Sequence, residues 1–115
     1  MFEGKEGTEL IDCIRQAQID ISYKEISVEN ATSLLNDAIA TLEKTDGELE
    51  KKDLLVLISQ SFRKYGKELL PIFIKFFENS KKSFYHVLCI LETLREFKRK
   101  EPPLELPKNI LAYAQ

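Results

Sequence analysis

The sequence predicts an all-α fold: a compact bundle or a stack of α-hairpins, with five helices and a short C-terminal helical turn. Apolar residues recur every three or four positions along nearly the whole chain, and no segment alternates at the period of two that is typical of strands. The connections that contain Gly, Pro, Asp or Ser are short. The chain has 115 residues, 43% of them hydrophobic, so we expect residues 1–115 to form a single helical domain.

The first two predicted helices are amphipathic. Thr8 is the expected N-cap of the first helix, and Ser27 is the expected N-cap of the second. Residues 1–7 precede the first cap and are expected to be flexible. The apolar stripe of the first helix consists of Leu10, Ile14, Ala17 and Ile21. The stripe of the second helix consists of Val28, Ala31, Leu35, Ala38 and Leu42.

The third predicted helix runs from Glu48 to Tyr65, after a break at residues 45–47. Its centre is apolar nearly all round, so we expect it to be the most buried helix. Gly66 suits the position directly after its end. The fourth helix opens at residues 69–71, where the proline is tolerated because it falls in the first turn, and ends near residue 79.

The fifth predicted helix is capped by Ser80 or Ser83 and runs to about Arg99. Residues 101–107 contain three prolines and are expected to form an extended connector. The last of these prolines opens a short final helix over residues 108–113. The expected inner face of the fifth helix consists of Phe84, Val87, Leu88, Leu91 and Leu94.

The stretch from Arg63 to Asn79 reads RKYGKELLPIFIKFFEN, in which one helix ends at a glycine and the next opens with Glu-Leu-Leu-Pro. It resembles part of a HEAT or armadillo-type α-solenoid, and the resemblance covers residues 53–99. The resemblance implies a protein-binding scaffold, because stacked helix pairs build extended surfaces. The chain departs from the family at Asn79, where the turn usually carries Asp, and at Phe84 and Tyr85, where a Val-Arg pair usually opens the second helix.

Charge is distributed unevenly along the chain. The formal net charge is −2, but residues 1–60 carry 13 acidic and 6 basic side chains, a balance of −7. Residues 61–115 carry 6 acidic and 11 basic side chains, a balance of +5. The overall balance excludes a uniformly basic nucleic-acid coat, and the asymmetry is of the kind that orients charged partners.

The basic half also contains the residues that we predict to contact a partner. Lys81 and Lys82 lie near the start of a predicted helix, where the helix dipole disfavours cations, so they indicate an anionic partner surface. The fourth predicted helix is apolar over a wide arc, which would leave an exposed patch if it is not wholly covered. The candidate partner-binding residues are Phe76, Phe77, Lys81, Lys82, Tyr85, Lys98, Arg99 and Lys100.

No catalytic, metal or cofactor site is predicted. Cys13 and Cys89 lie among apolar residues, so we interpret both cysteines as buried thiols. His86 is the single histidine, so the chain has too few ligands for a zinc site. Gly47 directly follows Asp46, which does not fit a calcium loop. The glycines are isolated, so there is no nucleotide-binding loop. We therefore expect no enzymatic activity.

The functional prediction is a small non-catalytic helical module, an adaptor or regulatory subunit, that binds another protein as a monomer or weak homodimer. There is no secretory pattern, and the longest apolar run, residues 54–58, is far shorter than the roughly 20 residues that cross a bilayer. We therefore expect a cytoplasmic protein without membrane association. Two alternatives remain: a nucleic-acid-binding regulator that uses residues 61–100, and an acidic immunity-type inhibitor that uses residues 1–60.

Overall fold

The structure, a computed structural model, describes residues 2–79, 84–99 and 106–113. These residues contain helices and no strand, so the predicted all-α fold is confirmed. The helical elements are α1 (Gly7–Tyr23), α2 (Val28–Lys44), α3 (Glu48–Tyr65), the 3-10 turn η1 (Gly66–Leu69), α4 (Leu70–Asn79), α5 (Phe84–Arg99) and α6 (Lys108–Tyr113).

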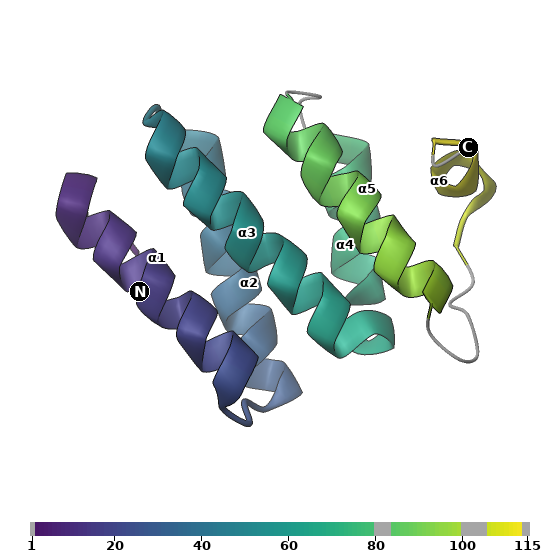
Figure 1. The fold of residues 1–115 in the computed structure, drawn as a ribbon, viewed down its shortest axis with the longest axis horizontal. Helices are drawn as coiled ribbons and strands as arrows, with labels where there is room; N and C mark the ends of the chain where they lie inside the picture. Colours follow the sequence, from purple (N-terminus) through teal and green to yellow (C-terminus); the bar gives the residue numbers. More distant parts are fainter. Residues whose placement is uncertain (1, 80–83, 100–105, 114–115) are drawn as a thin grey trace.

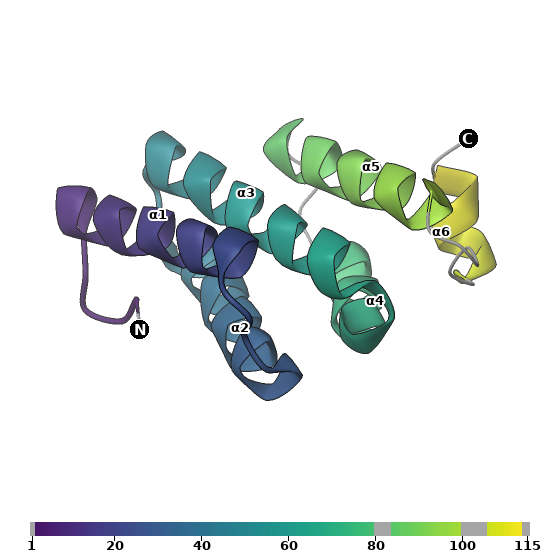
Figure 2. The ribbon, with the colours of Figure 1, turned by 60° about the horizontal axis from the view of Figure 1, so that its bottom comes forward.

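The helices are arranged in two layers (Figure 1). α1, α3 and α5 lie side by side and run in the same direction, and α2 and α4 return behind them. Figure 2 shows the same separation from another side, with α6 beyond α5 at the end of the array. The molecule measures 38 × 31 × 17 Å along its principal axes, so the two layers form a flat slab. We call the side of α1, α3 and α5 that points away from α2 and α4 the outer face.

α3 is the centre of the fold, as its apolar composition predicts. It packs against α1, α2 and α5. The ring of Phe62 meets that of Phe73 edge-to-face at a centroid distance of 5.0 Å, and Phe73 meets Phe97 at 5.2 Å. These rings join α3, α4 and α5 in one core. The buried residues of α3 are Leu54, Leu55, Leu57, Ile58, Ser59, Ser61 and Phe62.

Two helix ends follow the sequence closely. The hydroxyl oxygen of Ser27 accepts a hydrogen bond from the backbone N–H of Asn30 at 3.1 Å, which confirms the predicted N-cap of α2. Gly66 directly follows α3 with a φ of +52°, a conformation that favours glycine. The predicted caps of the fifth helix, Ser80 and Ser83, lie outside the described residues.

The start of the chain differs from the prediction in two respects. The cap assigned to Thr8 is wrong, because the N-cap of α1 is Glu6, two residues earlier, which makes no side-chain cap hydrogen bond. The first residues are docked at Phe2, whose side chain is 1% exposed and whose N–H donates to Asp37 Oδ2 of α2 at 3.1 Å. Burial of a Phe side chain contributes about 1.5–3 kcal/mol, which explains why this segment lies against the helices.

α5 buries a different face from the predicted one. Leu88 and Leu91, which were expected to point inward, are exposed, and Val87 is half-buried. Leu94 is buried as predicted, and the side chain of Phe84 lies outside the described part of the chain. The buried residues of α5 are Cys89, Ile90, Thr93, Leu94 and Phe97.

The small side chains of α5 explain this rotation. Cys89 Sγ lies 3.6 Å from the backbone carbonyl oxygen of Leu55, so α5 approaches the backbone of α3 closely at this point. Thr93 is fully buried, and its hydroxyl donates to the Cys89 carbonyl oxygen at 2.8 Å, which satisfies its polar group inside the core. A leucine in place of either residue would hold the two helices apart.

Candidate interaction surface

Phe76 and Phe77, two of the predicted partner-binding residues, are buried. Their side chains are 5% and 7% exposed. The ring of Phe76 lies 5.9 Å from that of Phe62 and is stacked on His86 at a centroid distance of 6.0 Å. These two rings therefore belong to the core, and they do not form the exposed aromatic patch that the sequence suggested.

Lys98 and Arg99, also in the predicted set, are exposed in the last turn of α5. Arg99 Nη1 lies 3.5 Å from Glu96 Oε1, one turn earlier on the same helix. Cations in this position are favoured by the helix dipole. The described part of the chain does not include three other predicted residues, Lys81, Lys82 and Lys100. It also does not include the side chain of Tyr85.

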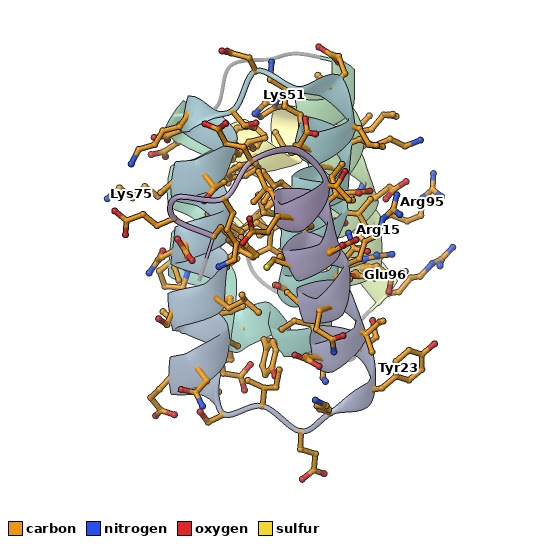
Figure 3. The ribbon with its side chains drawn as sticks, turned by 90° about the vertical axis from the view of Figure 1, so that its left-hand side faces the viewer. Arg15, Tyr23, Lys51, Lys75, Arg95 and Glu96 are labelled. Atoms are coloured by element: carbon orange, nitrogen blue, oxygen red, sulfur yellow. The ribbon has the colours of Figure 1, made fainter. Side chains whose placement is uncertain are left out.

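The outer face presents a different set of exposed side chains. Figure 3 shows Arg15 and Tyr23 of α1 and Arg95 of α5 projecting from the same side of the molecule, while Lys75 of α4 projects from the opposite side. Ile19 lies four residues from both Arg15 and Tyr23, so it shares their face of α1. The outer face therefore combines charged, aromatic and apolar side chains.

Leu49, seven residues before Val56, and Leu91, three residues after Leu88, are exposed apolar residues of this layer. Three further exposed apolar residues, one from each helix, lie on the outer face at similar levels. They are Ile19 (49% exposed), Val56 (39%) and Leu88 (42%). Leu88 precedes Arg95 by seven residues, or two turns, and so shares its face of α5. α3 is flanked by α1 and α5, and α2 lies behind it. An exposed residue of α3 such as Val56 therefore lies on the outer side of the helix.

Contacts between the helices show that these three residues lie at similar levels. Arg15 Nε is 3.2 Å from Asp53 Oδ2. Ile19 follows Arg15 by four residues and Val56 follows Asp53 by three. Because α1 and α3 run in the same direction, Ile19 and Val56 lie within about one helical turn of the same level.

The α3–α5 contact gives the same result. Cys89 Sγ lies beside the Leu55 carbonyl oxygen, and Leu88 and Val56 are their immediate neighbours in sequence. Packed helix axes are about 8–10 Å apart, so the three residues cross the outer face over about 20 Å. We call Ile19, Val56 and Leu88 the apolar row.

Cations predominate around the α3–α5 end of the apolar row. Residues that are three, four or seven positions apart on a helix share a face, which identifies the charged neighbours of Val56 and Leu88. Among the described side chains there are three cations and two anions, and one of the anions, Asp53, is already paired with Arg15 of α1. These charged residues are Lys52, Asp53, Arg63, Glu92 and Arg95.

A groove of about 610 Å³ lies at the opposite edge of the array, between α1 and α2. Ala17 and Leu34 contribute apolar walls, and Asp20 and Asp37 contribute carboxylates. Asp37 also accepts the hydrogen bond from the Phe2 N–H, so the N-terminal segment lies at one end of this groove. The lining residues also include Lys24, which is paired with Asp20, and Ser33, and they include no histidine or cysteine.

The surroundings of Cys89 and Asp20 shift the pKa values of these two groups. Burial raises the pKa of Cys89 to about 12, so the thiol is protonated and unreactive at neutral pH. Cys13 is half-buried. Hydrogen bonds from Lys24 and Gln16 lower the pKa of Asp20, which keeps this carboxylate ionised. Within the described ranges, no three His, Cys, Asp or Glu side chains come together in a way that would hold a metal ion.

Comparison with known proteins does not assign a function to this chain, so a functional proposal depends on its surface. No protein-family model, curated protein or solved structure matches the chain. In the part that the structure describes, no helix is long and apolar enough to cross a lipid bilayer.

The apolar row was missed by sequence reasoning. Ile19 lies off the main stripe of its helix, Val56 lies in a helix that is apolar on most sides, and Leu88 was assigned to the inner face. The available signal was that each helix of the outer layer has an apolar residue opposite its buried stripe. Only the levels set by the Arg15–Asp53 and Cys89–Leu55 contacts bring the three residues together.

Proposed function

We propose that this protein is a small non-catalytic helical module that binds another protein through the apolar row and the cations beside it. The observation that carries the proposal is the alignment of Ile19, Val56 and Leu88, all exposed, across three neighbouring helices. Exposed apolar side chains rimmed by charged ones are typical of protein–protein contact sites. No nucleophile–base pair or ligand cluster is part of the proposed surface.

The arrangement of the layers supports the proposal. Parallel α1, α3 and α5 with α2 and α4 behind them are what stacked α-hairpins would produce. We therefore extend the proposal to a HEAT-like scaffold, in which the outer face acts as the extended binding surface. Cys13 and Cys89 are both thiols, which agrees with a proposed location in the reducing cytoplasm.

A comparison of point variants tests the proposed function. The full chain and its Leu88→Asp variant would serve as bait in a native lysate, and the dissociation constant of the recovered protein would then be measured with purified components. We expect Leu88→Asp to weaken binding by about 10-fold or more, because it puts a carboxylate into an apolar contact.

Val28→Asp is the matched control for this variant. Val28 is also an exposed apolar residue, at the first position of α2, where an acidic side chain suits the helix dipole. We expect it to bind within about twofold of the wild type. Equal weakening by both variants, or unchanged binding by Leu88→Asp, would contradict the proposal. Binding of an RNA or DNA probe that falls steeply with salt would favour the nucleic-acid alternative instead.

A further inference from the structure

We infer that the apolar row binds an amphipathic α-helix of the partner, laid across α1, α3 and α5, with acidic residues at its α5 end. This inference rests on the proposed function and specifies the partner. The spacing of the apolar row supports this partner. Neighbouring helices place their exposed residues about 8–10 Å apart, and residues i and i+7 of an α-helix lie about 10.5 Å apart on one face.

A partner helix therefore matches the apolar row residue for residue. Apolar side chains at positions i, i+7 and i+14 would meet Ile19, Val56 and Leu88 in turn. An extended strand repeats its side chains on one face every 6.6 Å or so, which does not match this spacing. The outer face also consists of helices, whose backbone groups are bonded internally, so it offers no edge to which a strand could be added.

The charges beside the apolar row support the acidic character of the partner helix. Arg63 and Arg95 lie seven residues after Val56 and Leu88 respectively, so one cation follows the apolar row on each of α3 and α5. Three cations stand against two anions at this end, and one of these anions is already paired with a cation of α1. At the α1 end, the cation Arg15 is already bound to a carboxylate, Asp53 of α3. Acidic residues of the partner are therefore favoured near its third apolar contact, which fixes the direction of the bound helix.

Designed peptides test the inference on the isotopically labelled 115-residue chain by NMR titration. The probe is a helical peptide of about 18 residues with leucines at three positions seven apart and glutamates around the last leucine. One control peptide has lysines in place of the glutamates. A second control keeps the composition but distributes the leucines around the helix.

We expect the acidic peptide to shift amide signals of α1, α3 and α5, and to bind about 10-fold more tightly than either control peptide. Arg95→Glu should weaken binding of the acidic peptide by about 10-fold and strengthen binding of the lysine peptide, because it reverses the local charge. Lys75→Glu makes the same charge change on the opposite face, so it should leave binding within about twofold.

Three results would overturn the inference: equal binding of the acidic and lysine peptides, shifts centred on α2 or α4, or no binding of the acidic peptide at about 1 mM. These results are distinguishable from failure of the proposed function. A recovered protein that is lost by Leu88→Asp and kept by Val28→Asp would still support protein binding through the apolar row, with a partner surface of another kind.

Discussion

α3 is bound to its two neighbours in the outer layer by different kinds of contact. Toward α1, whose buried apolar stripe belongs to the same core, there are polar contacts in addition. Asp53 Oδ2 meets Arg15 Nε at 3.2 Å, and the Asp53 carbonyl oxygen accepts from Gln18 Nε2 at 2.8 Å. Near the other end of α3, Lys64 Nζ donates to the carbonyl oxygen of Lys24 at 2.9 Å and to that of Ile21.

Toward α5 the contacts are apolar and aromatic. Cys89 packs beside the backbone of α3, and Phe62 is linked to Phe97 of α5 through the ring of Phe73. The comparison teaches that burial of apolar side chains stabilises both sides of α3, and that hydrogen bonds and an ion pair are added on the α1 side. Hydrogen bonds and ion pairs set the position of α1 along the axis of α3, whereas buried area and close packing set the distance of α5.

Removal of the central aromatic ring should have the largest effect. Phe62 is fully buried and contacts Phe73 and Phe76, so Phe62→Ala would leave a cavity between α3, α4 and α5. We expect a loss of about 3–5 kcal/mol in the free energy of unfolding, measured by urea denaturation followed by circular dichroism. A loss below about 1 kcal/mol would mean that the α5 side of α3 is not stabilised by these rings.

An enlarged side chain should reveal how closely α5 approaches α3. Cys89→Leu forces extra volume against the Leu55 carbonyl group, and we expect a loss of about 1–3 kcal/mol by the same measurement. Cys89→Ala is the control, because it removes the thiol without adding volume. If Cys89→Leu were as stable as Cys89→Ala, the helices would not be in close contact at this point.

Loss of a polar contact on the α1 side should cost less. Lys64→Met keeps an apolar stem but removes both hydrogen bonds to the C-terminal end of α1, and we expect a loss of about 1 kcal/mol. Lys67→Met, at an exposed position of η1, is the matched control and should stay within about 0.5 kcal/mol of the wild type. An equal effect of the two variants would show that Lys64 does not hold α1 in place.

The thiol of Cys89 should be unreactive in the native state. Its pKa of about 12 predicts that iodoacetamide at pH 8 modifies Cys89 only after denaturation, as followed by mass spectrometry. A thiol pKa raised in the folded state stabilises the fold below the unfolded-state pKa, and this contribution is lost as the pH rises toward 12. The wild type should therefore lose more stability than Cys89→Ala in this alkaline range. Rapid labelling of native Cys89 would contradict the burial of the α3–α5 contact.

Much of the fold was predictable because it depends on local patterns. Ser27 has a side chain suited to an N-cap, Gly66 adopts the positive φ at the end of α3, and the extent of α3 follows from its apolar run. The prediction for α5 was wrong at Leu88 and Leu91, because apolar residues lie on more than one side of this helix. Periodicity alone does not say which side approaches α3.

The candidate surface was harder to predict because it depends on contacts between distant residues. The docking of Phe2 involves Asp37, which is 35 residues away, so no local sequence pattern predicts it. Phe76 and Phe77 look like an exposed aromatic pair only if the core that covers them is unknown. The apolar row exists because three helices are aligned by contacts that span 34 and 38 residues of the chain.

The most direct test of the account is a methyl cross-saturation experiment on the complex with the recovered protein. Irradiation of the unlabelled partner reduces the intensity of methyl signals that lie in the interface. The account predicts the strongest losses at Ile19, Val56 and Leu88, and no loss at Val28 on α2. Losses at Val28 with unchanged signals from the apolar row would contradict the claim that the outer face of α1, α3 and α5 is the binding surface.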